Sequence, residues 1–589
     1  MAKYVGYKRP KDTKKTLKQL FVYLGHYKWM LILVAFLVFI SAGANVTGTY
    51  LIKPVVNRFI VPGNMTGLLK AVIAMGVMYA CGALSTLGYN RIMVKMSQKV
   101  IQDIRNDLFA HVQKLPLKYF DAHTHGELMS RFTNDVDTLV QSLNQSLSTM
   151  VSSFVQIIGF LVMMLSISWK MTLMALIVIP LSLILVMVVV KKSQRYFKAQ
   201  QKSLGLVNGH IEEMYSAHTI VKAFNGEEDS LRTFKEYNDQ LYTSAWKSQF
   251  LSGLMMPLTN LIGNIGYVGV CILGGYLTIH KEIAVGDIQS FITYTRNFTQ
   301  PISQISQSMN MLQSTAAAAE RVFEFLAAEE EICDVKNPVV LEDVQGQVTF
   351  ENVCFGYDPN KIVINNFSMY IKPGQTTAIV GPTGAGKTTI VKLLMRFYEL
   401  NAGSIYIDGH NITEYTRSGL RNMVGMVLQD AWLFEGSILE NLRFGKPSAT
   451  DDEVIQAAKA AHVDHFIHTL DHGYGTVLNE SSSNISQGQR QLLTIARAFL
   501  ADPKILILDE ATSSVDTRTE VRIQKAMDNL MRGRTSFIIA HRLSTIRDAD
   551  LILVMKDGDI IEQGNHEELL AANGFYANLY NSQFEDVVA

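Results

Sequence analysis

Gly381-Pro-Thr-Gly-Ala-Gly-Lys-Thr388 follows the apolar run Thr376–Val380 and decides the fold of the C-terminal half. Backbone N–H groups of such a glycine-rich turn can close around phosphate oxygens, and a helix after it presents its positive dipole end to them. Asn484-Ile-Ser-Gln-Gly-Gln-Arg490 and Ile505-Leu-Ile-Leu-Asp-Glu510 follow in order. A Ser-x-Gly-Gln turn before an apolar strand that ends in Asp-Glu occurs in far fewer classes of protein than a phosphate loop alone. The C-terminal half is therefore predicted to be an α/β nucleotide-binding domain.

The N-terminal half has the composition of a membrane domain. The chain has 589 residues, of which 48% are apolar and 18% charged, and the charges are unevenly placed. Apolar stretches of roughly 20 residues are long enough to cross a bilayer as helices. We predict six such spans, near Trp29–Leu51, Leu68–Tyr89, Leu147–Trp169, Met171–Val190, Leu254–Ile279 and Ile288–Met309.

Basic residues around the first span predict its orientation. The segment before it carries many lysines and arginines against one acid, Asp12, which favours a cytoplasmic start. The long charged stretches Arg91–Ser146 and Lys191–Gln249, together with the C-terminal half, then fall on the cytoplasmic side. A cleaved signal peptide is the alternative for the first span, but the polar segment before it and the length of its apolar run oppose that interpretation.

Cysteines and net charge exclude other classes of protein. Cys81, Cys271, Cys333 and Cys354 form no CxxC pair and lie near no histidine cluster, so neither a zinc site nor a disulfide framework is predicted. The 53 basic residues balance 53 acidic ones, which gives no indication of nucleic-acid binding.

The two long charged stretches are predicted to be more than loops. From Met93 to Val112 apolar residues recur at helical spacing, so the second span should continue as a helix for about 25 residues, or close to 40 Å, beyond the membrane. A bend then follows at Tyr119–Asp135. On spacing alone a solvated helix hairpin with Gly126 at its turn is as good an interpretation as a docking loop.

Taken together, the C-terminal motifs resemble the nucleotide-binding domain of ATP-binding cassette (ABC) transporters. The Gly, Ser-Arg and Asn-Asp pattern within 119–135 is similar to the first coupling loop of ABC exporters, and 209–234 resembles the second, which docks on the partner's nucleotide domain. The resemblance implies a six-helix all-α membrane domain with long cytoplasmic extensions, fused to an α/β P-loop ATPase. The expected divisions are a basic segment with an elbow helix at 1–28, the transmembrane domain at 29–328, a linker at 329–346 and the ATPase domain at 347–589.

The phosphate loop and the Asp-Glu strand predict the chemistry of ATP hydrolysis. Lys387 should reach the β and γ phosphates and Thr388 should hold Mg²⁺. Asp509, at the end of its strand, is placed to hold Mg²⁺ through water. Glu510 would orient or deprotonate the attacking water, a role worth roughly 10²–10⁴-fold in rate.

The resemblance assigns the remaining site residues. Tyr357 matches the aromatic that stacks on adenine, Gln429 the glutamine that links Mg²⁺ and water to the coupling helices, Asp516 the loop between paired domains and His541 the γ-phosphate contact. Without the resemblance, such an aromatic is more often packing and a lone histidine is ordinary. The expected ATP-binding residues are Tyr357, Gly381, Thr383, Gly384, Ala385, Gly386, Lys387, Thr388, Thr389, Ser486, Gly488, Gln489 and Asp516. The expected catalytic residues are Glu510, His541 and Gln429, and the expected Mg²⁺ ligands are Thr388, Gln429 and Asp509.

Departures from the family pattern bear on the partner. The usual signature is Leu-Ser-Gly-Gly-Gln, whereas Ile485 and Gln487 replace the leucine and the middle glycine; Glu480 is kept upstream, but two glycines are lost. The signature of one chain closes on ATP held by another, so an altered signature beside Glu510 favours a heterodimer with a second half-transporter. A homodimer is the alternative, because working exporters also tolerate glutamine here.

The transported substrate is the property that the sequence indicates least strongly. Polar residues interrupt the sixth span, and Arg296 is the deepest ionisable one; it either lines the translocation path or is held by a neighbouring helix carbonyl or carboxylate. The 26 methionines suit a promiscuous surface and favour multidrug efflux of amphipathic compounds across the plasma membrane. A lipid or peptide exporter is the alternative, and an ATP-gated channel is a third.

Overall fold

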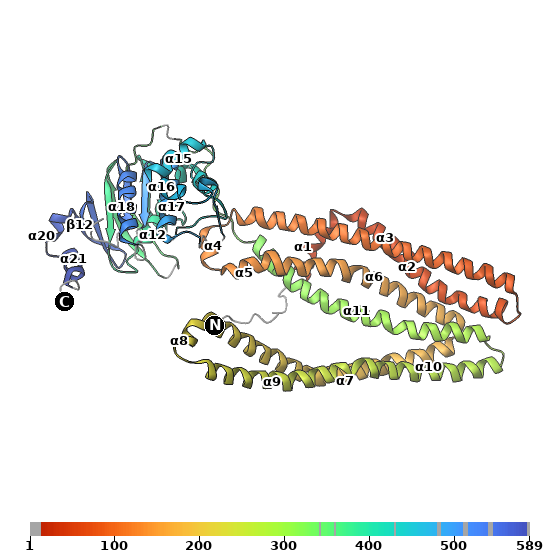
Figure 1. Ribbon diagram of the computed structural model, residues 1–589. Coiled ribbons are helices and arrows are strands. Elements are labelled where there is room, and N and C mark those ends of the chain that lie inside the picture. The colour runs from red at the N-terminus through yellow and green to blue at the C-terminus, as the bar shows by residue number, and fades with distance from the viewer. Residues whose placement is uncertain are drawn as a thin grey trace. The chain divides into compact units, whose positions relative to one another are not determined.

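The chain divides into two compact units, each described by itself (Figure 1). The computed structural model describes residues 13–585 except 341–342, 359–360, 429–430, 480–483, 510–515 and 540–545. The helical unit comprises Met1–Lys114 and His123–Ala328, and the nucleotide-binding unit comprises Leu115–Ala122 and Glu329–Ala589. A short segment that lies early in the sequence therefore belongs by its contacts to the second unit.

The helical unit consists of long helices joined by short turns. At 1.5 Å per residue, the 48-residue helices α3 and α7 are each about 70 Å long, more than twice the ~30 Å of a bilayer core. The helices are α1 (Thr13–Gly25), α2 (Lys28–Val55), α3 (Met65–Val112), α5 (His125–Ser130), α6 (Val136–Ile167), α7 (Trp169–Ser216), α8 (His218–Ala223), α9 (Glu227–Gly253), α10 (Met255–Ile279) and α11 (Val285–Leu326), with π-helical turns η1 (Val56–Ile60) and η2 (Arg131–Asp135).

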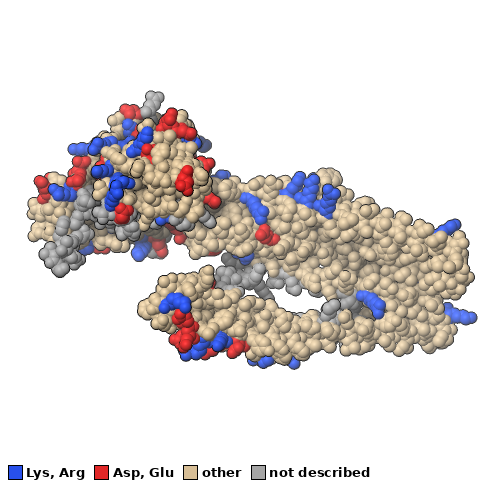
Figure 2. Space-filling view, in the orientation of Figure 1, with Lys and Arg blue, Asp and Glu red and all other residues tan. Residues whose placement is uncertain are grey.

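Several helices have the length and composition of membrane spans. In the described part of the chain, four helical stretches qualify: Lys28–Ile60, Met65–Val112, His125–Ile167 and Asn260–Ile279. On the face drawn in Figure 2, Lys, Arg, Asp and Glu are sparse over most of the helical unit and dense over the nucleotide-binding unit. The predicted spans Met171–Val190 and Ile288–Met309 fall inside α7 and α11. Some side chains of both lie outside the described residues, so these two spans remain predictions.

The extension of the second span is confirmed. In α3 the predicted apolar face, including Met93, Val100, Ile104 and Leu108, is buried. Elsewhere α7 and α9 run side by side (Figure 1). Ser193 and Ser252 share a hydrogen bond of 3.3 Å between these helices, and small side chains of this kind let two backbones approach closely.

An ion pair and an aromatic ring join three segments at one end of the helical unit. Arg321 on α11 donates to Asp135 at the end of η2, with 2.9 Å between Nε and Oδ2. The ring of Phe325, one turn later on α11, contacts the guanidinium of Arg131 at 5.7 Å and the ring of His111 from α3 at 5.9 Å. This group of residues therefore fixes α3, η2 and α11 to one another.

The nucleotide-binding unit contains a largely parallel sheet and an antiparallel sheet. The six-stranded sheet has the order β12-β11-β3-β10-β9-β6, with β12 antiparallel, and the four-stranded sheet has the order β2-β1-β4-β5. The strands are β1 (Val348–Phe355), β2 (Ile364–Ile371), β3 (Thr376–Val380), β4 (Ala402–Ile407), β5 (His410–Asn411), β6 (Val424–Val427), β7 (Gly436–Ser437), β8 (Val477–Leu478), β9 (Ile505–Asp509), β10 (Thr535–Ile539), β11 (Leu551–Lys556) and β12 (Asp559–Gly564).

Helices complete this unit. The short helix α4 (Leu117–Asp121) belongs here by its contacts. The others are α12 (Lys387–Leu394), α13 (Arg417–Met423), α14 (Ile438–Arg443), α15 (Asp451–Ala460), α16 (Asp464–His468), α17 (Gln487–Ala501), α18 (Thr517–Met531), α20 (His566–Ala571) and α21 (Phe575–Glu585), with a 3₁₀ turn η3 (Gly473–Gly475).

The central strands are buried on both faces, as apolar runs of a parallel sheet should be. In β9, Leu506 and Leu508 join the cluster of α14, α15, α17 and α18, whereas Ile505 and Ile507 join the cluster of the antiparallel sheet and α12. The parallel register pairs Ile538 of β10 with Ala378 of β3 and with Leu508 of β9. The carboxyl ends of β3, β9 and β10 therefore meet at one edge of the sheet.

The ion pair at Asp135 yields the first prediction. Its side chain is 6% exposed and that of Arg321 is 36% exposed. Asp135→Ala should lower the unfolding free energy of the helical unit by about 2–3 kcal/mol, below the ~3–5 kcal/mol of a fully buried pair because Arg321 is partly solvated. Thermal unfolding in detergent checks this value.

Asp137→Ala is the matched control, since Asp137 is 62% exposed and its partner Arg105 is 48% exposed. Removal of such a surface pair should cost about 0–1 kcal/mol. Equal losses in the two variants would contradict the structural role of Asp135.

Candidate nucleotide-binding site

The phosphate loop lies between β3 and α12 in a conformation that requires glycine. A Cβ on Gly381 would stand 2.2 Å from the carbonyl oxygen of Met555 on β11, so no side chain fits there. Gly384 and Gly386 have φ of +88° and +101°, where L-residues are strained. The loop residues Thr383 and Gly384 are exposed, whereas Ala385 is buried beneath them. The backbone thus forms an exposed cradle over a packed base.

Lys387 begins α12 and reaches back over this loop. Its Nζ donates to the carbonyl oxygens of Gly381 at 2.7 Å and Pro382 at 3.0 Å. Burial lowers the pKa of Lys387, and the nearby charge of Asp509 opposes that shift. Asp509, at the carboxyl end of β9, is 9% exposed. The fold has therefore brought together the lysine and the carboxylate that the sequence placed 122 residues apart.

Tyr357 lies next to the start of α12. Its hydroxyl is 3.2 Å from Oγ1 of Thr389, and its ring packs edge-on against Phe355 at 5.0 Å and Tyr398 at 5.1 Å. The residue is 40% exposed, so part of the ring remains open to a flat ligand. This geometry suits an adenine platform, while two of its edges also serve as packing.

The signature turn forms a regular helix start despite its altered residues. Ser486 caps α17: its hydroxyl accepts from the N–H of Gln489 at 3.3 Å, and its own N–H donates to Oε1 of Gln489 at 2.8 Å. Gly488 is buried and Gln487 is exposed. Ile485, 8% exposed, packs in the core as the usual leucine would. The glutamine thus disturbs neither the cap nor the helix.

Asp516 caps α18 and accepts from the N–H groups of Arg518 at 3.1 Å and Thr519 at 3.0 Å. Hydrogen bonds from Thr519 lower the pKa of this carboxyl. The predicted catalytic residues Glu510, His541 and Gln429 lie outside the described residues, as does Glu480. Their roles therefore remain predictions.

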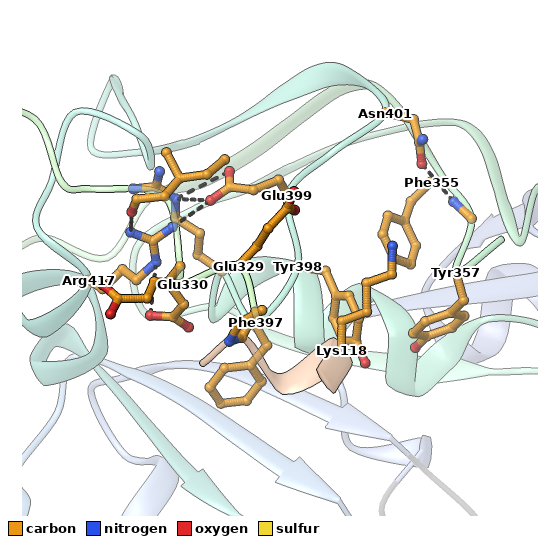
Figure 3. A pocket seen from close by; sticks show the side chains of 15 residues that line it. Lys118, Glu329, Glu330, Phe355, Tyr357, Phe397, Tyr398, Glu399, Asn401 and Arg417 are labelled. Atoms are coloured by element: carbon orange, nitrogen blue, oxygen red, sulfur yellow. Dashed lines mark hydrogen bonds and ion pairs between the residues drawn. The ribbon is translucent and has the colours of Figure 1, made fainter. Parts of the chain in front are cut away.

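The structure adds residues around Tyr357 that the sequence did not single out. A pocket of about 300 Å³ is lined by parts of α4, the linker, β1 and the segment 396–401. Phe355, Tyr357 and Tyr398 gather at one end, and Arg417 lies with Glu330 at the other (Figure 3). Arg417 donates to Asp334 at 2.8 Å and to Glu399 at 2.8 Å, which fixes the linker to α13.

Arg497 on α17 is a second residue that sequence reasoning missed. It donates to the carbonyl oxygens of Asn441 at 2.6 Å and Trp432 at 2.7 Å, and its guanidinium lies 5.7 Å from the Phe434 ring. Burial lowers its pKa to about 10. The helix that starts at the signature turn is thereby joined to the segment that follows Gln429.

These residues fit a nucleotide triphosphate and a divalent cation. A Cβ at Gly384 would meet no atom within 4 Å, so this exposed part of the loop has room for phosphate oxygens, and Lys387 supplies a cation beside it. Thr388 is an exposed residue at the start of α12, which follows β3 at the sheet edge where β9 ends in Asp509. Hydroxyl, carboxylate and phosphate oxygens are the ligands that Mg²⁺ prefers.

Comparison with known proteins agrees with both units. The family model described as the ABC transporter transmembrane region matches residues 31–302, and the family model described as ABC transporter matches residues 364–513. A fatty acid ABC transporter ATP-binding/permease protein of Mycobacterium bovis is 50% identical over 499 residues, 85% of this chain and 79% of that protein. An ATP-dependent lipid A-core flippase of Desulfotalea psychrophila is 35% identical over 571 residues, 97% of this chain and 100% of that protein.

A solved structure agrees over nearly the whole length. The structure of a bacterial Atm1-family ABC exporter with ATP bound gives a TM-score of 0.75 at 28% identity, covering 94% of this chain and 98% of that chain. The predicted fold class, a helical membrane domain followed by a P-loop ATPase, is confirmed.

The glycines of the phosphate loop yield a prediction with an internal control. Gly381→Ala should remove ATP binding and lower the unfolding free energy of this unit by more than about 2 kcal/mol, because the new Cβ meets the Met555 carbonyl. Gly384→Ala meets no atom within 4 Å, so only backbone strain of about 1 kcal/mol is expected. Binding of a fluorescent ATP analogue and thermal unfolding measure both effects, and equal effects would contradict the close approach at Gly381.

Proposed function

We propose, since this chain belongs to the ABC transporter family and is an ATP-driven exporter, that its cargo is an amphipathic lipid with an anionic headgroup. One relative is named a fatty acid transporter and another a lipid A-core flippase. Both names denote acyl-chain amphiphiles. Lipid export, the alternative in the sequence analysis, is therefore preferred here to multidrug efflux.

The observation that carries this proposal is the place of Arg296. It lies on α11, eleven residues after Val285, which is about 17 Å along the helix and about half of a bilayer core. Its guanidinium lies 5.3 Å from the Tyr267 ring of α10, and Arg296 is exposed on its unit. The described neighbour is thus an aromatic ring, where a carbonyl or carboxylate was the expected alternative. A cation held on a ring can still receive the carboxylate or phosphate of a lipid whose tails contact the apolar helices.

Export would be driven at the nucleotide site. In this proposal Lys387 and the loop N–H groups hold the phosphates, Tyr357 receives the adenine, and Thr388, Asp509 and Gln429 hold Mg²⁺. Mg²⁺ held by these residues would supply positive charge beside the phosphates, while Glu510 would orient or deprotonate the attacking water and His541 would contact the γ-phosphate. The ATPase domain and both termini would lie on the cytoplasmic side of a bacterial plasma membrane.

A second half-transporter is the proposed partner. Gln487 is exposed at the start of α17, and this supports a role in which its side chain meets the nucleotide of another chain. A long amide there would weaken closure at the partner's site and leave the site around Lys387 to the partner's own signature. The heterodimer therefore remains our proposal, with the homodimer as its alternative.

Lipid export is tested with proteoliposomes that contain the chain and its dimer partner. ATP should increase the movement of a fluorescent fatty acid or anionic phospholipid, and the lipid should stimulate ATPase activity, whereas neutral amphipathic dyes should do neither. Arg296→Gln should reduce lipid stimulation at least about threefold, because it removes the cation. Glu510→Gln is the control that binds ATP without turnover.

Dye transport without lipid transport would favour multidrug efflux instead. ATP-dependent ion current without coupled turnover would indicate a channel. Turnover of Glu510→Gln within a few-fold of the parent, less than about 1 kcal/mol of barrier, would refute the role of Glu510.

The dimer is tested by expressing the chain alone and together with a candidate second half-transporter. We expect robust ATPase activity only from the pair. Gln487→Gly should slow nucleotide release from the partner's phosphate loop and leave the site of Lys387 unchanged. Full activity of the chain alone would refute the heterodimer and leave the exporter assignment intact.

A further inference from the structure

The surroundings of Tyr357 contain a carboxylate from a distant part of the chain. Asp121, the last residue of α4, accepts a hydrogen bond from the hydroxyl of Tyr398, 277 positions later. The same Asp121 Oδ2 lies 3.8 Å from Nζ of Lys392 on α12. Both partners of this carboxylate are neighbours of Tyr357.

Tyr398 and Lys392 together restrict the Tyr357 ring. The ring of Tyr398 stands nearly perpendicular to it, at 89° and 5.1 Å. The ammonium of Lys392 lies 5.7 Å from the centroid of Tyr357 and 5.9 Å from that of Tyr398. Figure 3 shows the Tyr357 and Tyr398 rings next to each other at this end of the pocket. With Phe355 at a further edge and Thr389 at the hydroxyl, Tyr357 has little freedom except at its exposed part.

We infer that Asp121 is a positioning residue for the nucleobase: by holding Tyr398 and Lys392, it sets the orientation of Tyr357 and so makes base recognition depend on the seating of α4. The inference rests on the proposed ATP site, in which Tyr357 receives the adenine.

The contacts of Tyr398 and Lys392 indicate that Asp121 makes the orientation of Tyr357 more defined. Tyr398 is 8% exposed, and its hydroxyl donates to an ionised group, which is a stronger hydrogen bond than one between neutral groups. Burial, with the Asp121 hydrogen bond, raises the pKa of Tyr398, so the hydroxyl stays protonated as the donor. Lys392 is a mobile cation that would otherwise explore several rotamers, and Asp121 favours the rotamer over the two rings. Loss of Asp121 therefore loosens two of the contacts that orient Tyr357 and leaves the phosphate loop intact.

The position of α4 in the chain connects base recognition to the membrane helices. Pro116 precedes α4, and Leu115 and Leu117 pack in the nucleotide-binding unit, while the chain continues on either side into α3 and α5 of the helical unit. A pull on α3 or α5 therefore reaches Asp121 through a few residues of backbone. The affinity for the base then depends on a segment that the membrane helices can displace.

The test measures base preference on the full chain with its dimer partner in lipid nanodiscs. Asp121→Ala and Tyr398→Phe should each raise KM for ATP by about threefold to tenfold and leave kcat within about twofold. Both variants should lower the preference for ATP over CTP, whose smaller base stacks less. Inhibition by inorganic triphosphate, which has no base, should be unchanged. Tyr370→Phe, which removes an exposed hydroxyl on β2, is the matched control and should alter none of these values.

Tyr357→Ala separates the inference from its premise. Tyr357→Ala should remove most of the preference for ATP over CTP. In the double variant Tyr357→Ala/Asp121→Ala, the fold-change in KM should be smaller than the product of the fold-changes of the two single variants. Loss of preference in Tyr357→Ala but not in Asp121→Ala or Tyr398→Phe would overturn the inference and keep the ATP site. An unchanged preference in Tyr357→Ala would overturn both the inference and the adenine assignment. The lipid-export proposal is independent of every one of these outcomes, because no cargo is present.

Discussion

The nucleotide-binding unit depends on one close approach of two backbones. Gly381 passes so near the carbonyl of Met555 that β3 and β11 can continue as neighbours only if this position has no side chain. That contact fixes the direction in which the loop leaves the sheet, and hence the first turn of α12. Lys387, Thr389 and Lys392 all take their places from this turn. The shape of the glycine loop, the start of α12 and the packing around Tyr357 are therefore consequences of a single packing constraint.

The helical unit obeys a different constraint. In a bilayer every backbone N–H and C=O must be satisfied within its own segment, so long uninterrupted helices are required and charged residues are expensive. Two ionic contacts of the described residues join other segments of this unit to the two ends of α11. Lys53 of α2 lies 2.7 Å from Asp287 near the start of α11, and Asp135 joins η2 to Arg321 at the other end of that helix. Between these ends, the contact of Arg296 among the described residues is the Tyr267 ring, and for this reason we propose it as the residue that meets the cargo.

Sequence patterns predicted the architecture and the position of the phosphate loop, because each pattern depends on local chemistry, whereas the roles of the site residues stay predictions. Each of three patterns favours one local structure: the glycine spacing of 381–388, the apolar run that ends at Asp509 and the helical period from Met93 onward. The neighbours of Tyr357 could not be found in this way. Asp121 and Tyr398 are far apart in sequence, and an Asp at the end of a five-residue helix has no distinctive pattern. The resemblance did indicate that 119–135 should dock, but only side-chain packing identifies the atom that makes the contact.

The assignment of α4 changes where the ATPase domain begins as a folding unit. A fragment cut at the linker would contain every sequence motif for nucleotide hydrolysis, yet it would lack Leu115, Leu117 and Asp121, and the apolar surface that they cover would face water. The free energy of unfolding of such a fragment therefore differs from that of the domain in the intact chain. Catalytic constants measured on such a fragment would describe an ATPase domain that lacks α4 and its contacts.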